Sequence, residues 1–277
     1  MHTRVETVQI GGLSVRLHTL APPGGPSDAE RPTVVLVHGI GMSHRSFARS
    51  QRALAATHRT VSVDLPGFGG VRGPGRRLSM AELADLVVRA VRARGARTLV
   101  LVGQSMGTQV VVEAARRHPD VVVSVVLVGP VINARRRRLP MQALDLGRDG
   151  FVEGIRMNGV LVTDYLRSMR QYLFELGPMM RYPLERAVAD VAQPVLVVRG
   201  TQDPIARQEW SAQVAAAAPR GVLVELPGPH HAQERQPVAF ARHVRESTSS
   251  PAVPPVPHRL SEPTPEHPTE HAAEQAR

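Results

Sequence analysis

The sequence predicts an α/β fold in which a mostly parallel, doubly wound sheet is flanked by helices. Two observations carry this prediction. Runs of aliphatic and β-branched residues at 33–38 (TVVLVH) and 122–128 (VVSVVLV) show no polar alternation, which is typical of strands buried on both faces. Segments with apolar residues at helical spacing separate such runs, and strands joined through helices run parallel. The 277 residues are enough to enclose one large core.

The first predicted elements form a hairpin. Residues 5–10 and 13–19 flank Gly11 and Gly12, and paired glycines between two such runs mark a tight turn. The parallel part of the sheet follows, and Pro119 ends one of its helices. Its elements are expected in this order: strand 33–38, helix 46–56, strand 60–64, helix 80–94, strand 98–102, helix 109–118 and strand 122–128, then strands 194–200 and 221–226 after an insertion.

The insertion, 129–194, is helical in pattern and rich in aromatic and methionine side chains, although aromatic residues make up only 3% of the chain. We expect it to form an apolar cap over the strand ends. A helical subdomain with a small core of its own is the alternative. The side chains concerned are Phe151, Phe174, Tyr165, Tyr172, Tyr182, Met141, Met157, Met169, Met179 and Met180.

The domain boundaries follow from these patterns. We expect residues 1–130 and 194–246 to be the two parts of the core, and 131–193 to be the helical cap. The arginine run at 135–138 is expected to be a solvated hinge surface. Residues 247–277 contain seven prolines between 251 and 268 and almost no apolar pattern, so they are predicted to be a disordered tail.

The composition excludes several classes of chemistry. All 34 basic residues are arginines, so Schiff-base chemistry and a P-loop lysine are excluded. The absence of cysteine excludes disulfides, thiolate catalysis and the common zinc motifs, and we predict neither a metal nor a cofactor. The net charge of +10 suits nucleic acid, but the arginines are scattered and aromatic residues are scarce. We therefore expect a small-molecule substrate and no nucleic-acid partner.

The residues at the start of the chain contain no apolar segment of the signal-peptide kind, and no stretch approaches about 18 uncharged apolar residues. On this basis we expect a cytoplasmic protein without a membrane partner. The oligomeric state stays open.

The segment 103–107 (GQSMG) gives Ser105 a chemical role. An apolar strand, 98–102, leads into it and a helical pattern follows. A strand that ends in a tight turn lifts one side chain above the sheet, and glycines on both sides allow that turn. Ser105 is therefore the candidate nucleophile, although an ordinary strand-to-helix loop can carry the same five residues.

Four motifs in order now identify a resemblance: 38–41 (HGIG), 64–69 (DLPGFG), 103–107 (GQSMG) and 200–203 (GTQD) with a late histidine. With them, residues 5–245 resemble the α/β-hydrolase fold superfamily, in particular its capped serine hydrolases of the esterase and lipase kind. The resemblance implies a Ser-His-Asp triad at the carboxyl edge of the sheet. Gln104 and the Gly70 that follows the 64–69 turn depart from the residues common in that family, and neither is a triad position.

The resemblance implies roles for further residues. Asp203, in a turn before Pro204, is the expected acid, although an ordinary turn aspartate fits the same position. Two histidines compete as the base: the distance to Pro237 selects His230, whereas the histidine–alanine pair common in relatives favours His231.

The oxyanion of the tetrahedral intermediate is expected to bind the backbone N–H groups of Ile40 and Met106. His38 is expected to brace the loop that carries the first of these groups. The residues expected to contact substrate are Gly39, Gln104, Tyr165 and Phe174.

We predict hydrolysis of a carboxylic ester with a small or medium apolar acyl or aryl group, through an acyl-enzyme. Thioesterase, lactonase and carbon–carbon bond hydrolase activities of the same fold are alternatives, and arginines such as Arg156, Arg167 or Arg170 can supply the polar group that the carbon–carbon reaction needs. A non-catalytic binding protein on this scaffold is the alternative of another class.

Overall fold

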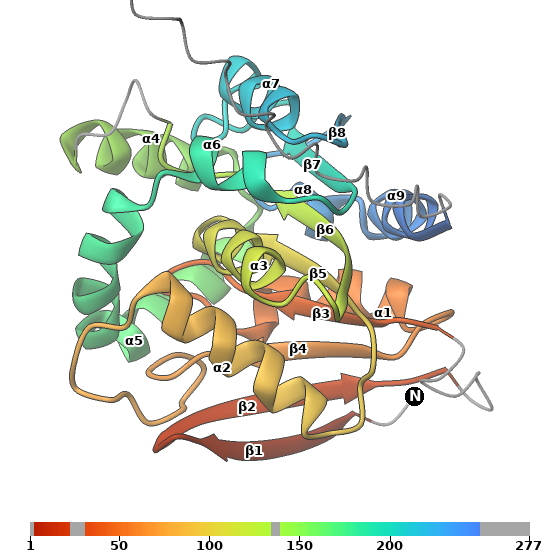
Figure 1. The fold of residues 1–277 in the computed structure, drawn as a ribbon. Coiled ribbons are helices and arrows are strands. Elements are labelled where there is room, and N and C mark those ends of the chain that lie inside the picture. Colours follow the sequence, from red (N-terminus) through yellow and green to blue (C-terminus); the bar gives the residue numbers. More distant parts are fainter. Residues whose placement is uncertain (1–2, 23–30, 134–138, 250–277) are drawn as a thin grey trace, which may run out of the picture.

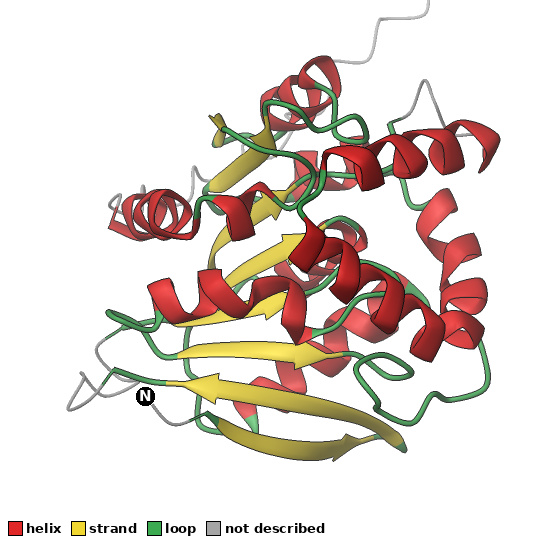
Figure 2. Ribbon diagram, turned by 180° about the vertical axis from the view of Figure 1, so that it is seen from behind, coloured by secondary structure: helices red, strands yellow, loops and turns green. Residues whose placement is uncertain are grey.

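The computed structural model describes residues 3–22, 31–133 and 139–249 and consists of one eight-stranded sheet with helices on both faces (Figures 1 and 2). The strand order is β1-β2-β4-β3-β5-β6-β7-β8. β2 pairs antiparallel with β1 and β4, and the remaining pairs are parallel. The predicted α/β fold is confirmed. The strands are β1 (Arg4–Ile10), β2 (Leu13–Leu20), β3 (Thr33–Val37), β4 (Thr60–Asp64), β5 (Leu99–Gln104), β6 (Val122–Val128), β7 (Val195–Gly200) and β8 (Gly221–Leu226).

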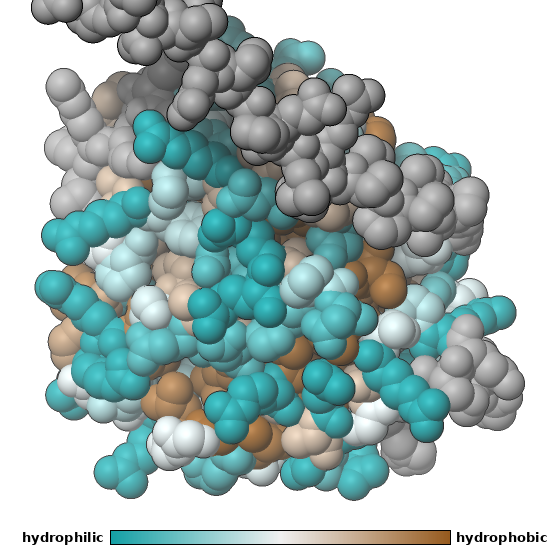
Figure 3. All heavy atoms as spheres, in the orientation of Figure 1, coloured by the Kyte–Doolittle hydropathy of each residue, from teal (hydrophilic) through white to brown (hydrophobic). Residues whose placement is uncertain are grey.

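The sheet separates two layers of apolar side chains. In β3, Val35 and Val37 pack in the layer shared with the helices α2 (Met80–Arg92), α3 (Met106–Arg117) and α7 (Gln208–Ala217). Val34 and Leu36 pack in the layer shared with α1 (Ala48–Leu54) and α9 (Pro237–Ser249). Both faces of this strand are therefore covered, which is why its sequence is uniformly apolar. Figure 3 shows mainly hydrophilic side chains over α2 and α3, whose apolar side chains pack in the first layer instead.

The helices largely follow the predicted order. They are α1 (Ala48–Leu54), preceded by the 3₁₀ turn η1 (His44–Phe47), α2 (Met80–Arg92), α3 (Met106–Arg117), α4 (Leu139–Val152), α5 (Ile155–Arg181), α6 (Leu184–Ala187) with the 3₁₀ turn η3 (Val188–Asp190), α7 (Gln208–Ala217), α8 (Ala232–Arg235) and α9 (Pro237–Ser249). The helix expected at 46–56 is thus shorter and begins as a 3₁₀ turn. α7 has no counterpart in the sequence prediction, because its alanine-rich sequence carries only Trp210 and Val214 as large apolar residues. Among the described residues, no helix has the length and apolar character needed to cross a bilayer.

Two sequence predictions concern residues outside this description. The arginine run at 135–138 lies outside the described residues, as does 250–277 of the expected tail. The tail was expected to begin at residue 247, but α9 continues through Ser249.

The helices α4 and α5 lie at the end of the sheet toward which the parallel strands point (Figure 2). Several contacts fix α5 to the loops at these strand ends. The Asp164 carboxylate accepts hydrogen bonds from the Ser43 hydroxyl (2.5 Å) and from Arg45 (2.8 Å). The Gln109 amide on α3 donates to the carbonyl of Met179 near the other end of α5 (3.1 Å). The long helix is therefore held along its length against the core.

Glu175 on α5 gives the fold a pH-dependent stability. Its side chain is fully buried and accepts hydrogen bonds from Gln171 (2.6 Å) and from the Leu78 N–H (3.2 Å). Burial outweighs these hydrogen bonds and raises the pKa of Glu175 to about 7. A carboxyl whose pKa is higher in the folded than in the unfolded state loses stabilising free energy as the pH rises from the unfolded through the folded pKa.

Replacing Glu175 with glutamine should therefore increase the free energy of unfolding above pH 7 by on the order of 2–3 kcal/mol and change it little near pH 4. Urea unfolding at pH 4.5 and pH 8 measures both values. Glu209→Gln, at an exposed position on α7, is the control. A gain for Glu175→Gln that is equal at both pH values would contradict the assignment.

Candidate active site

Ser105 occupies a strained turn between β5 and α3. Its backbone has φ 56° and ψ −121°, a conformation that a non-glycine residue adopts only when the surrounding structure enforces it. A Cβ atom on Gly103 would lie 2.1 Å from the Gly107 carbonyl oxygen, and one on Gly107 would lie 2.2 Å from the Val37 carbonyl oxygen. The two glycines let β3, β5 and α3 approach closely enough to form this turn. The side chain of Ser105 lines a cavity at the strand ends.

His230 lines the same cavity and pairs with Asp203. Its Nδ1 lies 2.7 Å from Oδ2 of Asp203, whose other oxygen accepts hydrogen bonds from the N–H groups of Ile205 (2.8 Å) and Ala206 (2.9 Å). These donors hold the carboxylate in place after β7. Because Asp203 accepts the proton on Nδ1, Nε2 is free to act as an acceptor. This Nε2 is buried and has no hydrogen-bond partner among the described residues.

The backbone around His230 leaves room for its imidazole. Gly129, which follows β6 with φ 55°, lies so close that a Cβ atom there would be 2.7 Å from Cε1 and 2.8 Å from Nδ1 of His230. A side chain at position 129 would displace the ring from Asp203. The ends of β6, β7 and β8 thus converge on one histidine.

The charges around His230 change its pKa. Burial lowers it, but the charge and hydrogen bond of Asp203, with smaller contributions from Asp149 and Glu153, raise the pKa of His230 to about 9. Burial raises the pKa of Asp203, and the opposing effect of His230 and the two backbone N–H groups brings it below its usual value. The pair is therefore an imidazole stabilised in its protonated form by an ionised carboxylate.

The neighbouring His231 has a carboxylate of its own. Its Nδ1 lies 2.8 Å from Oε1 of Glu153, which also accepts the His231 N–H (2.9 Å). Asp149 accepts the N–H of His230 (3.1 Å). The two acids, Asp149 on the last turn of α4 and Glu153 directly after that helix, therefore hold the peptide that carries both histidines. The sequence analysis did not identify these two acids. Their spacing of four residues, which would place them on one side of a helix, was visible in the sequence, but whether that side faces the histidines was not.

The residues expected to supply the oxyanion donors are found at the cavity or directly after Ser105. Ile40 lines the cavity, and Met106 is the first residue of α3, where backbone N–H groups have no partner within the helix. His38 connects the loop carrying Ile40 to the loop after β4. Its Nε2 accepts the Leu65 N–H (3.2 Å), so Nδ1 carries the proton and donates to the Gly39 carbonyl (2.8 Å). This is the bracing contact expected for His38.

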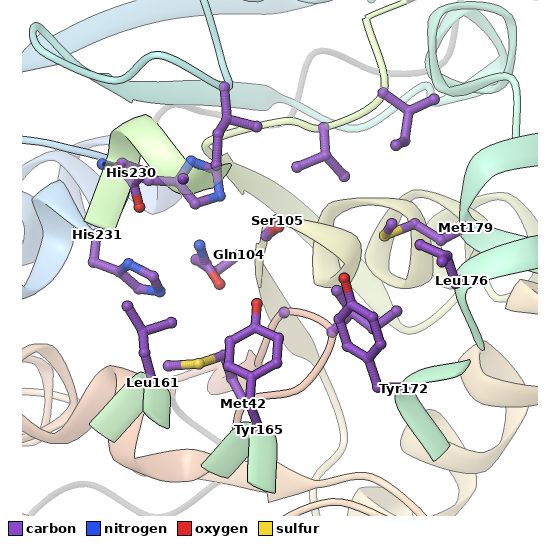
Figure 4. Close-up of a pocket in the computed structure, with 17 residues that line it drawn as sticks. Met42, Gln104, Ser105, Leu161, Tyr165, Tyr172, Leu176, Met179, His230 and His231 are labelled. Atoms are coloured by element: carbon purple, nitrogen blue, oxygen red, sulfur yellow. Dashed lines mark hydrogen bonds between the residues drawn. The ribbon is translucent and has the colours of Figure 1, made fainter. Parts of the chain in front are cut away.

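The cavity has a volume of about 550 Å³ (Figure 4). Of the residues expected to contact substrate, Gly39, Gln104 and Tyr165 line it. Phe174 is not among the lining residues; its ring lies 5.8 Å from the guanidinium of Arg170 instead. The expectation for Phe174 is therefore wrong, and Tyr172 lines the cavity instead. Tyr172 follows Tyr165 by seven residues, about two helical turns, and so lies on the same face of α5. Phe174 follows Tyr165 by nine residues and lies on the opposite face. The remaining apolar lining is Ile40, Met42, Val131, Ile132, Leu161, Leu176, Met179 and Ile205.

Two groups of side chains in the described ranges bring three possible metal-ligating atoms within 4.8 Å of one another. The first is His18, His44 and Asp64, in which both imidazoles contact the carboxylate. The second is Asp149, Glu153 and His231. Each group is already joined by imidazole–carboxylate hydrogen bonds, and the absence of a metal in the mechanism stays a prediction.

Comparison with known proteins places this arrangement in a family. The model of a family described as alpha/beta hydrolase matches residues 34–243. The chain is 30% identical over 240 residues to the dihydrolipoyllysine-residue acetyltransferase component of an acetoin cleaving system from Cupriavidus necator, covering 78% of this chain and 61% of that protein. It is 27% identical over 237 residues to the pimeloyl-(acyl-carrier protein) methyl ester esterase of Nitrosospira multiformis, covering 73% and 88%.

Solved structures agree in fold. The enol-lactonase from Burkholderia xenovorans superimposes with a TM-score of 0.73 at 20% identity, covering 87% of this chain and 99% of that one. The family match spans the sheet from β3 to α9, including the turn at Ser105 and the loops carrying Asp203 and His230. The chain spans less than two thirds of the length of the first curated relatives it matches, and it belongs to the alpha/beta hydrolase family.

Proposed function

We propose that this protein hydrolyses a carboxylic ester with a small or medium apolar acyl or aryl group, through a covalent acyl-enzyme on Ser105. One observation carries the proposal. Ser105 and His230 line one cavity, and the Asp203 carboxylate binds Nδ1 of His230 and leaves Nε2 without a partner. A serine hydroxyl is a weak nucleophile near neutral pH and requires such a base.

In the proposed reaction, Nε2 of His230 takes the proton of Ser105 while Oγ attacks the ester carbonyl carbon. The N–H groups of Ile40 and Met106 stabilise the negative charge on the carbonyl oxygen. The tetrahedral intermediate collapses when His230 gives the proton to the leaving alcohol. A water molecule, deprotonated by the same nitrogen, then releases the acid and restores Ser105.

The lining of the cavity supports an apolar substrate. Eight aliphatic or methionine side chains and two tyrosines surround the few polar groups, and the volume of about 550 Å³ suits a small or medium ester. Residues 131–193 act in this proposal as the cap between the two core parts, 1–130 and 194–246, because α5 supplies Leu161, Leu176 and Met179 to the wall.

The carbon–carbon bond hydrolase alternative lacks the support it requires. It depended on cap arginines reaching the cavity, but Arg156 pairs with Glu234 and Arg170 lies against Phe174. None of the three arginines considered for this role is among the residues that line the cavity. Lactone and thioester substrates fit the same proposed chemistry and belong in the assay.

Labelling with a fluorophosphonate tests the proposal. A serine activated by an imidazole reacts covalently, so intact-mass and peptide measurements should find one adduct, on Ser105. The heat-denatured chain and the Ser105→Ala variant are the controls. A folded chain that forms no adduct and hydrolyses none of a panel of p-nitrophenyl esters, lactones and thioesters would instead be a binding protein on this scaffold.

The pH dependence provides a further prediction. Because the base must be neutral to accept the Ser105 proton, kcat/KM for an ester should rise with pH through an apparent pKa above 6.5, toward the value of about 9 for His230. Asp149 contributes to this shift and contacts the backbone N–H of His230, which asparagine can still bind. Asp149→Asn should therefore move the midpoint to lower pH.

The profiles of wild type, Asp149→Asn and the control Asp190→Asn should be measured between pH 5 and 10 with a neutral ester. Asp190 is on η3 at the surface, and its carboxylate pairs with Arg116. A midpoint that moves upward in Asp149→Asn, or equally in both variants, would refute the contribution of Asp149.

A further inference from the structure

Of the polar side chains in the cavity that the proposed reaction does not use, Gln104 and His231 carry buried atoms without a partner in the described part of the chain. Gln104 is 1% exposed and neither atom of its amide has a hydrogen-bond partner among the described residues. His231 is 2% exposed and its Nε2 also lacks a partner within that part of the chain. Each unpaired buried polar group costs about 1–3 kcal/mol. Both side chains line the cavity, where a bound molecule can supply the missing partners.

The hydrogen-bonding capacity of His231 is fixed by Glu153. The carboxylate of Glu153 accepts both the backbone N–H and the Nδ1 proton of His231. Burial raises the pKa of Glu153, but the hydrogen bond and charge of His231 bring it below its usual value. With Nδ1 bound to Glu153, Nε2 is the ring nitrogen left for a bound molecule. The ring points into the cavity (Figure 4).

The position of Gln104 is also specific. It is the last residue of β5, directly before Ser105, and its amide projects into the cavity (Figure 4). Gly39 makes room for it, since a Cβ atom at that position would lie 2.6 Å from Oε1 of Gln104. The amide offers a donor and an acceptor. The same Cβ atom on Gly39 would lie 2.8 Å from Cβ of Ser105, so the amide of Gln104 and the side chain of Ser105 flank one point and a group bound by Gln104 is only a few bonds from a carbonyl attacked by Ser105.

We propose that Gln104 and His231 form a polar subsite that binds a hydroxyl group on the acyl part of the substrate, at carbon 2 or carbon 3. The hydroxyl, which can both donate and accept, forms hydrogen bonds with Nε2 of His231 and with the amide of Gln104. This inference rests on the proposed ester hydrolysis and narrows its substrate class to hydroxyacyl esters. The apolar walls hold the rest of the acyl chain.

A hydroxyl fits this subsite better than a charged group. Three carboxylates lie close together around the two histidines: Asp149, Glu153 and Asp203. They disfavour a carboxylate on the substrate. An ammonium group carries only donors, so it cannot accept a hydrogen bond from the amide of Gln104. A hydroxyl both donates and accepts and satisfies the unpaired atoms of either kind.

Matched esters test the subsite. We would measure kcat/KM for ethyl 3-hydroxybutanoate against ethyl 3-methylbutanoate, and for the 2-hydroxy and 2-methyl pair, each divided by the rate of hydroxide-catalysed hydrolysis of that ester. Methyl and hydroxyl are similar in size, so the ratio reports hydrogen bonding. For at least one pair the wild type should favour the hydroxy ester about 5- to 150-fold, the factor that 1–3 kcal/mol produces. Ethyl 3-aminobutanoate serves as the charged alternative.

The variants His231→Phe and Gln104→Leu should each lower this ratio toward one. His243→Phe, a matched substitution on α9 away from the cavity, should keep it. Binding of the same esters to the uncleaving Ser105→Ala variant, followed by NMR titration, provides a readout that does not depend on turnover. It should show the same preference for the hydroxy ester.

The results separate the subsite from the proposed function. If the wild type hydrolyses all of these esters without a preference for hydroxyl, the subsite is refuted and ester hydrolysis stands. A preference that survives in both His231→Phe and Gln104→Leu refutes it too, as does a stronger preference for the amino ester. If Ser105 takes no fluorophosphonate and no ester is cleaved, the proposed function fails and the subsite fails with it.

Discussion

Replacing Ser105 with alanine is expected to lower kcat/KM for ester hydrolysis by at least about 10⁴-fold, as removal of the nucleophile does in enzymes of this mechanism. The fold should persist, because alanine also fits the turn and Gly103 and Gly107 still allow the close approach of the neighbouring backbone. We expect the free energy of unfolding to change by less than about 1 kcal/mol. Hydrolysis of p-nitrophenyl butanoate and urea unfolding measure the two effects.

Ser124→Ala is the matched control for this experiment. Ser124 is a buried serine on β6, the strand beside β5, and it does not line the cavity. It should keep wild-type activity. If Ser105→Ala still hydrolyses the ester at the wild-type rate in a folded protein, the nucleophile has been assigned to the wrong residue.

The second large effect is expected from the two histidines. His230→Gln should lower kcat/KM for an unsubstituted alkyl ester by about 10⁴-fold or more, since it removes the base paired with Asp203. His231→Gln should lower it by less than about 100-fold, since the proposed mechanism routes no proton through His231. Steady-state kinetics with the same ester, together with thermal unfolding of both variants, makes the comparison.

The order of the two losses decides the assignment. A larger loss in His231→Gln would make the Glu153–His231 pair the base and its acid. Full activity in both variants would exclude both histidines. In either case His230 would not be the base, and the role of Asp203 would have to be reconsidered.

Much of the architecture is predictable from local sequence. Strands such as 122–128 and 221–226 were predicted with the bounds that the structure has. A short, mostly apolar run between turn residues is too short for a typical helix and is therefore best explained as a buried strand. Helix α7 was missed, since alanine provides little amphipathic contrast. Phe174 was misjudged for a related reason: the composition of α5 is apparent in the sequence, but the face it turns to the cavity is not.

The choice between His230 and His231 illustrates the same limit more sharply. Adjacent residues in a turn point in different directions, and the two rings lie at 85° to each other with their centres 5.5 Å apart. One carboxylate therefore cannot bind both in the same way. Asp203 is 27 residues from His230, and Glu153 is 78 residues from His231. No local pattern links partners so far apart.

The sequence by itself determined the layered α/β architecture, the order of its strands along the chain and the turn that carries Ser105. Buried strands require apolar residues and close backbone approach requires glycine, so both features can be recognised from residue type. Tertiary structure alone decided which imidazole pairs with Asp203, that Asp149 on α4 and Glu153 just after it bind the two histidines, and which atoms are left unpaired in the cavity. Those outcomes depend on side-chain directions where distant segments meet. Hydrogen bonds require atoms within about 3 Å, a condition that only the folded chain defines.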